Sequence, residues 1–298
     1  MRWAAAFGLG LAAVLCLVSP APARACSSCL SGDPALLGSG LETPYAGRLR
    51  LSLTTRERSD TTGSGASADA MRELRFDLGL AWSPWSWLTV IADLPLAHRW
   101  LSGDSGATAR GFGPGELELG VRGTVWRDQE RAPTHRLTLG LGLKLPTAPL
   151  LRDERGNLKP IDVQLGTGSV DPRVDLLYTG RFGRFTVLGS TGATFPISGW
   201  MLLRPAPSWY GAAAAQLQPL NFLAFRAGLE ARYEAVSVQG GVLDPIGSGF
   251  LGSLTAGVLL SPTSDVVLDI GASIPVINGR IDAVAEPVFT AAIALDLG

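Results

Sequence analysis

The stretch from His135 to Thr147 alternates apolar and polar residues, and this pattern constrains the fold more than any other feature of the chain. Leucine occupies every second position from Leu137 to Leu145, with Thr, Gly, Gly and Lys in between. A period of two residues is typical of a β-strand with one apolar face. That face packs on a second sheet in a soluble β-sandwich, whereas it contacts lipid in a transmembrane β-barrel.

The first residues favour a secreted chain. Arg2 is followed by an apolar run over about residues 4–18 and then by Ala23-Arg24-Ala25. A positive residue, an apolar run and a small-residue cleavage site are typical of a secretory signal peptide. We therefore predict a signal peptide over 1–25 with cleavage near Ala25, an N-terminal cysteine-containing segment over 26–46 that lies in the periplasm or plugs the barrel, and one barrel domain over 47–298.

The charge balance and the apolar runs exclude several classes of protein. The chain has 25 basic and 26 acidic residues, a balance that predicts no nucleic-acid partner. After the predicted signal peptide, Gly, Pro or a charged residue interrupts every apolar run before it reaches the length of a membrane-spanning helix. If the mature chain crosses a membrane, it must do so as a closed barrel.

Segments of alternating residues bounded by turn signals recur along the chain. We count twelve candidate strands, with ten or fourteen as alternatives. They lie near 47–56, 72–82, 86–98, 115–127, 135–147, 170–182, 184–196, 206–217, 221–234, 249–261, 265–277 and 286–297.

The connectors between these strands alternate in length. Those near 83–85, 128–133, 183, 218–220 and 261–264 are short, and those near 57–71, 99–114, 148–169, 197–205, 235–248 and 278–285 are long. Outer-membrane barrels have short periplasmic turns and longer outer loops. The sequence therefore predicts an all-β fold, a transmembrane antiparallel up-and-down β-barrel of about twelve strands in the bacterial outer membrane, with both ends of the barrel sequence on the short-turn side.

The alternation also assigns residues to the two faces of the wall. One face is rich in Leu, Val and Phe, and Trp and Phe flank the short turns as an interfacial girdle would. The opposite face carries charges of both signs, which we predict to line the pore: Arg48, Arg50, Arg75, Asp77, Glu116, Glu118, Arg122, Lys144, Arg173, Asp175, Arg226, Glu230, Arg232, Glu234 and Asp269. Their near balance favours a narrow passage without strong ion selectivity. The alternative is a solvated inner face that only stabilises the wall.

Cys26 and Cys29 stand at the start of the predicted mature chain. A disulfide in the oxidising periplasm is the simplest interpretation. Lipidation of Cys26, soft-metal binding by the two thiolates and redox exchange remain alternatives. Leu30 occupies the position that a histidine would need for covalent haem attachment.

Two stretches carry a resemblance to a known family. LGLKLPTAP (141–149) and LGTGSVDPRVDLLYTG (165–180) resemble outer-membrane barrel proteins of the MetA-pathway of phenol degradation, or transporter, family. The family pattern is a strand ending in Lys-Leu-Pro-Thr-Gly, a loop, and Leu-Gly-Thr-Gly-Ser-x-Asp opening the next strand; Ala148 here replaces the glycine. From the residues alone we assign these motifs a structural role, with Pro146 ending a strand and Gly166 and Gly168 allowing a bend.

These observations together predict a channel or transporter for small solutes. The resemblance implies hydrophobic or aromatic compounds, whereas the polar inner face favours hydrophilic ones. The alternatives are a non-transporting structural or binding barrel whose cysteines engage a metal or a periplasmic partner, then a secreted soluble β-sandwich, and last a barrel hydrolase. We expect no enzymatic activity and no cofactor, because His98 and His135, the only histidines, fall near opposite ends of the barrel. The expected partners are outer-membrane lipid, the barrel-assembly machinery and small solutes.

Overall fold

The computed structural model describes residues 47–63, 69–103, 108–130 and 133–297. The predicted signal peptide, the segment over 26–46, Cys26 and Cys29 lie outside the described residues, so these assignments stay predictions.

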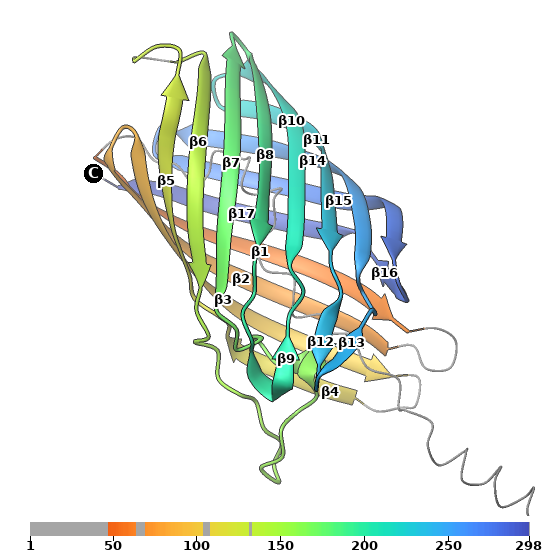
Figure 1. Cartoon of the computed structure of the whole chain (residues 1–298). Helices are drawn as coiled ribbons and strands as arrows, with labels where there is room; N and C mark the ends of the chain where they lie inside the picture. The colour runs from red at the N-terminus through yellow and green to blue at the C-terminus, as the bar shows by residue number, and fades with distance from the viewer. Residues whose placement is uncertain (1–46, 64–68, 104–107, 131–132, 298) are drawn as a thin grey trace, which may run out of the picture.

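Twelve long antiparallel strands form a closed barrel (Figure 1). Each strand pairs with its neighbours in chain order, and β1 also pairs with β17 from Leu49↔Leu297 to Glu57↔Phe289, which closes the ring. The predicted fold class and the count of twelve are therefore confirmed. The barrel strands are β1 (Leu49–Thr62), β2 (Asp69–Trp85), β3 (Leu88–Gly103), β5 (Glu118–Arg127), β6 (His135–Lys144), β7 (Asp171–Phe182), β8 (Phe185–Thr194), β10 (Ser208–Leu220), β11 (Leu223–Glu234), β14 (Gly249–Thr263), β15 (Val266–Arg280) and β17 (Val288–Leu297).

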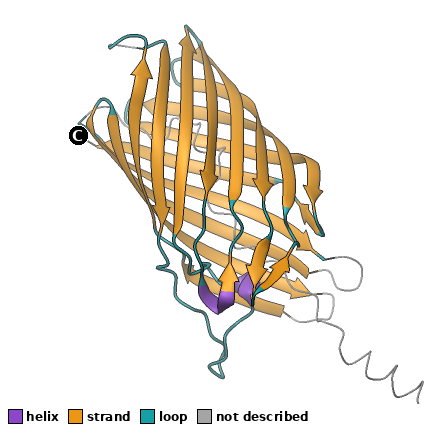
Figure 2. Ribbon diagram, viewed as in Figure 1, coloured by secondary structure: helices purple, strands orange, loops and turns teal. Residues whose placement is uncertain are grey.

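The long connectors contain short elements that the sequence did not predict. β4 (Thr108–Pro114) extends the sheet beside β3, and β16 (Ala283–Ala285) pairs with β1. A separate small sheet and two 3-10 turns complete them: β9 (Leu203–Arg204), β12 (Ser237–Gln239), β13 (Val242–Asp244), η3 (Ile161–Val163) and η4 (Trp200–Leu202). Both turns and the small sheet gather at the long-connector end of the barrel (Figure 2).

Several predicted boundaries are wrong. The region 57–71 was expected to be a loop, but β1 continues to Thr62 and β2 begins at Asp69. Likewise β3 runs five residues further than expected, to Gly103, and β6 ends at Lys144, before the predicted end. The outward residues of the β1 extension, Glu57, Ser59 and Thr61, are polar, because the strand continues beyond the apolar band, where the outer face no longer needs leucine.

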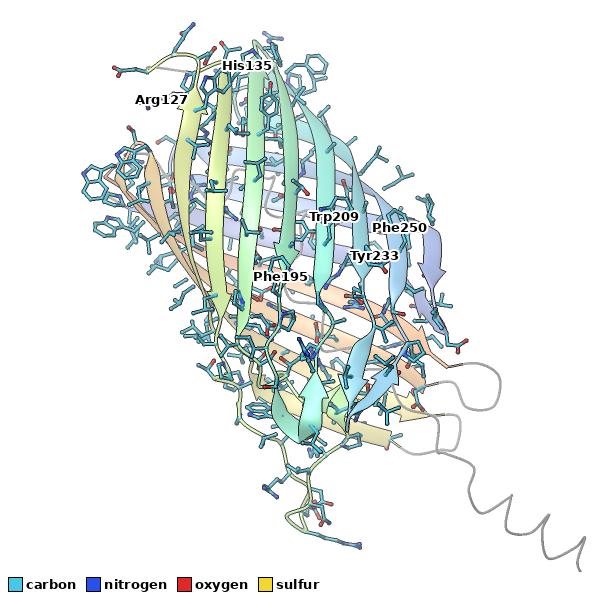
Figure 3. All side chains as sticks on the ribbon, viewed as in Figure 1. Arg127, His135, Phe195, Trp209, Tyr233 and Phe250 are labelled. Atoms are coloured by element: carbon cyan, nitrogen blue, oxygen red, sulfur yellow. The ribbon has the colours of Figure 1, made fainter. Side chains whose placement is uncertain are left out.

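The outer face of the barrel carries the apolar residues. Leu139 and Leu141 on β6 are 40% and 56% exposed. Aromatic residues mark both limits of this band: Trp82, Trp126 and Phe185 are exposed beside the short turns, and Trp209, Tyr233 and Phe250 form a register row towards the long connectors (Figure 3). Two aromatic girdles around an apolar band are typical of a barrel that spans a bilayer. No helix in the described ranges has the length and hydropathy needed to cross a membrane.

The wall is taller on one side than on the other. β2 and β3 have 17 and 16 residues, whereas β6 and β8 have 10 each. Above the end of β6, the connector to β7 therefore faces the inner surface of the taller strands. Because of this difference in height, residues of the β6–β7 connector can contact the inner face of β2 and β3 at the long-connector end of the barrel.

Candidate functional site in the barrel interior

The charged residues predicted on the sequence lie opposite the exposed leucines. Lys144 and Arg122 are 6% exposed, and Asp175 and Asp269 are 3% exposed. Because their strand neighbours on the outer face are exposed and the ring is closed, these side chains point into the barrel. Arg48 differs, because it lies at the short-turn rim.

Cross-strand ion pairs partner many of these groups. Arg50 donates to both carboxylate oxygens of Asp296 at 2.5 and 2.7 Å, across the β1–β17 seam. On the same side of the ring, Arg226 on β11 contacts Asp269 on β15 at 2.8 Å, across β14. A buried charge without a partner costs several kcal/mol, so the pairing explains why so many charges are tolerated inside.

At the rim, Arg48 contacts Asp265 at 2.7 Å in the turn between β14 and β15. The hydrogen bond from Arg48 holds the pKa of the Asp265 carboxyl below its usual value. This pair is solvent-exposed, in contrast to the ion pairs in the barrel interior.

A second group of charges lines a small hollow beside β5, β6 and β7. Arg173 lies 3.2 Å from both Glu118 and Asp175, and Tyr210 donates a hydrogen bond to Asp175. The inner face of β6 has glycine here: a Cβ at Gly142 would come within 3.2 Å of the Arg173 side chain. Glycine therefore provides the room in which the guanidinium lies along the wall.

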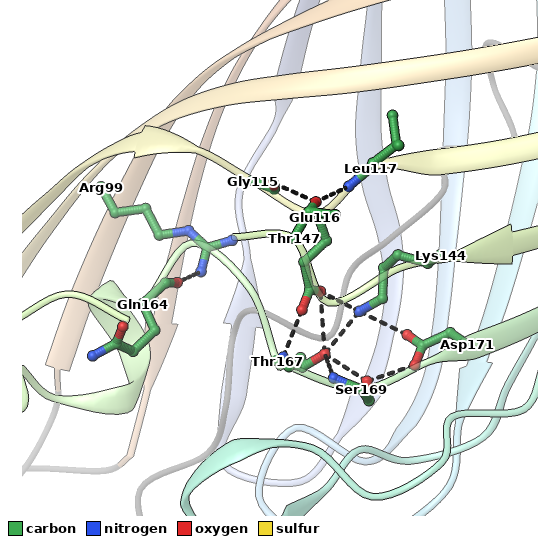
Figure 4. Close-up of polar contacts among 11 residues, drawn as sticks. Arg99, Gly115, Glu116, Leu117, Lys144, Thr147, Gln164, Thr167, Ser169 and Asp171 are labelled. Atoms are coloured by element: carbon green, nitrogen blue, oxygen red, sulfur yellow. Dashed lines mark hydrogen bonds and ion pairs between the residues drawn. The ribbon is translucent and has the colours of Figure 1, made fainter. Parts of the chain in front are cut away.

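The family-like motifs meet at a third group, the motif network, which consists of Glu116, Lys144, Thr167, Ser169 and Asp171 (Figure 4). Lys144 forms ion pairs with Glu116 and with Asp171 at 2.8 Å, and donates to Thr167 at 2.7 Å. Ser169 donates to Asp171 at 2.5 Å. All five side chains are at most 6% exposed.

Two glycines of the motif make the motif network possible. Gly168 has φ +69°, and its backbone N–H donates to Glu116 at 2.5 Å. Gly166 has no unusual φ; it is needed because a Cβ there would lie 2.5 Å from the Glu116 carboxyl carbon. The bend predicted at Gly168 is confirmed, whereas Gly166 serves close packing.

The segment 161–169, here called the outer cap, covers the inner face of the taller strands. Val163 is fully buried against Met71 and Leu101. Arg99 fixes the outer cap further, because it donates to the Gln164 carbonyl and forms an ion pair with Glu73. The outer cap therefore narrows the long-connector end of the barrel.

Sequence analysis missed several interior charges. Arg56, Asp60, Asp93 and Arg99 occupy inner-face positions, as do Glu73, Asp171, Arg280 and Asp296. Three of them, Asp60, Arg99 and Arg280, lie in strand extensions beyond the predicted ends, and the other five lie within predicted strands. Continuing the alternation past the expected strand ends would have found Asp60, Arg99 and Arg280.

The two histidines lie at opposite ends of the barrel, as predicted. His135 makes a 2.7 Å hydrogen bond with Tyr178 beside a short turn, and His98 contacts Trp100 in a tilted ring arrangement on the outer face of β3. Neither contact forms a nucleophile and base pair. Within the described residues, no group of three His, Cys, Asp or Glu side chains has metal-binding geometry.

Comparison with known proteins places the fold among outer-membrane barrels. No protein-family model and no curated protein sequence matches the chain. An outer membrane channel from Pseudomonas putida F1 superposes with a TM-score of 0.70 at 14% identity, covering 90% of this chain and 100% of the channel. The transport unit of the autotransporter AIDA-I from Escherichia coli superposes with a TM-score of 0.50 at 9% identity, covering 84% and 90%.

These structures share the architecture and are distant in sequence. The fold, together with the similarity to an outer membrane channel, supports a location in the outer membrane. The resemblance to the phenol-degradation family stays a prediction.

Proposed function

We propose that the protein is a passive outer-membrane channel for small polar solutes, with the fourteen predicted charges other than Arg48 lining its interior. The observation that carries the proposal is the hollow beside Arg173, which is bounded by Glu118, Asp175, Asp93 and Arg122. Charges of both signs at one level suit small polar molecules and limit ion selectivity. Twelve strands leave an interior between the filled eight-stranded barrels and the wide sixteen-stranded porins.

The outer cap supports a narrow rather than a wide passage. It covers the inner face of β2 and β3 through Val163 and Leu165, which are 0% and 5% exposed. Lys144 and Arg99 hold it from two sides. Solutes that enter from the long-connector end must pass beside it, so we expect a low size limit.

Two measurements test the proposal: single-channel conductance in planar bilayers, and swelling of liposomes with solutes of graded size. We expect a small conductance and swelling only with the smallest solutes. Silence across a range of voltages together with no swelling would contradict the channel and favour a non-transporting barrel.

Arg173→Ala tests whether the hollow is on the path. It leaves Glu118 and Asp175 without this cation, so the ratio of cation to anion permeability should rise. Arg173→Lys keeps the charge and should keep the ratio, and Arg184→Ala, exposed at the β7–β8 turn, is the matched control. A ratio in Arg173→Ala equal to that of the parent, in protein that still shows heat-modifiable migration, would place Arg173 off the path.

A further inference from the structure

The outward faces of β2, β3 and β4 carry two charged side chains, Arg72 and Arg110. Both are exposed. The other charged residues of these strands in the described ranges, such as Glu73 and Arg99, occupy inward positions of the alternation. Charge on the outer face of a barrel is costly within the apolar band and tolerated at its edges. The two arginines therefore indicate how deep this part of the outer surface lies relative to the apolar band.

The register places the two arginines on either side of an indole. Arg72 is the register partner of Trp100, and Trp100 is the register partner of Arg110. Neighbouring strands lie about 4.8 Å apart, so the arginine-bearing strands are separated by roughly 10 Å with the indole between them. The three strands lie side by side at the long-connector end in Figure 1. We call this row the Arg-Trp-Arg row.

The neighbouring rows locate the Arg-Trp-Arg row at the edge of the membrane. The adjacent row towards the short-turn end consists of Leu74, His98 and Phe112, and the next row in that direction consists of Phe76, Leu96 and Pro114. The row beyond it consists of the small residues Ala70, Ser102 and Thr108. Tryptophan and arginine directly above apolar and aromatic residues are typical of the headgroup level of a bilayer.

Neither arginine has a carboxylate partner in the described part of the chain. The interior arginines, by contrast, form pairs such as Arg226–Asp269 and Arg50–Asp296. The outward carboxylate on the adjoining strand β1 belongs to Glu57. It is in register with Leu74, one row from Arg72 towards the short-turn end. Lys159 also lies close to β4, because its Nζ donates to the Arg110 carbonyl at 2.8 Å.

We propose that the Arg-Trp-Arg row binds the phosphate groups of a phosphorylated glycolipid in the outer leaflet of the membrane. Guanidinium groups bind phosphate oxygens in a bidentate manner, and the two arginines at headgroup level supply the positive charge. The apolar rows below contact the acyl chains of the same lipid. The inference rests on the outer-membrane location and on the orientation with the long connectors outside.

The test uses the full-length folded protein in micelles of a neutral detergent. Native mass spectrometry counts bound lipid as a phosphorylated glycolipid, lipid A, is titrated in. The variants are Arg72→Gln/Arg110→Gln and the matched control Arg181→Gln/Arg184→Gln, which removes two exposed arginines at the short-turn end. Lipid A from which the phosphates have been removed and inorganic phosphate alone form the other two arms.

We expect the Arg72→Gln/Arg110→Gln protein to need at least ~10-fold more lipid A for half saturation, since each charge-assisted contact contributes on the order of tenfold. The control variant should bind lipid A like the parent, the dephosphorylated lipid should bind all proteins equally and more weakly than lipid A binds the parent, and inorganic phosphate should not bind. Equal affinity of the parent and the Arg72→Gln/Arg110→Gln protein, or an equal loss in the control, would overturn the proposal. So would phosphate-independent binding, or binding of inorganic phosphate alone, which would mean a free-anion site.

This result is separable from the channel proposal. Lipid binding is measured without conductance, so a silent channel leaves the lipid site intact. A protein that conducts but binds lipid A as well after both substitutions would refute the lipid site alone. Membrane fractionation checks the location itself.

Discussion

The two faces of β6 differ in what their residues must satisfy. Leu139, Leu141 and Leu143 on the outer face touch no specific partner and are 38–56% exposed. On the inner face, Gly140 and Gly142 lie against Asp175 and Arg173, and Lys144 has three polar partners. The outer face is determined by solvation, and the inner face by individual contacts. A substitution should therefore be read differently on each face.

The largest effect is expected on the inner face. Lys144→Met leaves Glu116 and Asp171 buried without their cation, which should lower the free energy of unfolding by about 3–5 kcal/mol. Urea unfolding in lipid vesicles, followed by tryptophan fluorescence, measures the change. Lys159→Met removes one hydrogen bond at the surface and should cost less than about 1 kcal/mol. Similar losses in both variants would contradict the distinction.

On the outer face the expected effect is somewhat smaller and has another cause. Leu139→Lys exposes an ammonium group to acyl chains, and a lysine near the bilayer midplane costs about 2–4 kcal/mol. Leu202→Lys is the control, because Leu202 is 79% exposed in a long connector. If Leu139→Lys were neutral in vesicle unfolding experiments, the leucine face would not contact lipid.

Two strand glycines differ in whether a side chain would fit at their positions. An alanine Cβ at Gly111 would lie 2.1 Å from the Val163 carbonyl oxygen, whereas a Cβ at Gly123 would meet nothing within 4 Å. Gly111→Ala should displace the outer cap at a cost of roughly 1–3 kcal/mol, and Gly123→Ala should be near neutral. Faster trypsin cleavage in the connector 145–170 reports the displacement. Unchanged cleavage would mean that the outer cap does not depend on this contact.

The smallest effect is expected at the rim, which belongs to neither face. In Arg48→Gln the pKa of Asp265 should rise towards its usual value, because the hydrogen bond that lowers it is lost. The stabilisation by this pair is present above the unfolded-state pKa and disappears as the pH falls through the folded-state pKa. A carboxyl NMR titration of both proteins checks this, and an unshifted Asp265 in the variant would show that Arg48 is not the cause.

The outer face could be predicted from the sequence because its rule is local. Alternation assigned Leu139 and Leu143 to lipid and located all twelve strands. The inner contacts could not be predicted, because the partners of Lys144 come from positions 116, 167 and 171, and alternation fixes neither the register of neighbouring strands nor the path of the β6–β7 connector. The strand ends were missed for a different reason: once β1 and β2 leave the apolar band, polar residues such as Thr61 no longer signal a turn.

The pairing of β1 with β17 joins the two ends of the barrel sequence. The partner of the first barrel strand is the last barrel strand, so no shorter part of the barrel sequence has a complete wall. Until β17 is in place, the edges of β1 and β15 offer unpaired backbone groups to any other polypeptide. A barrel truncated before Val288 would lack the strand that pairs with both β1 and β15, so protection of these edges depends on the ten residues of β17.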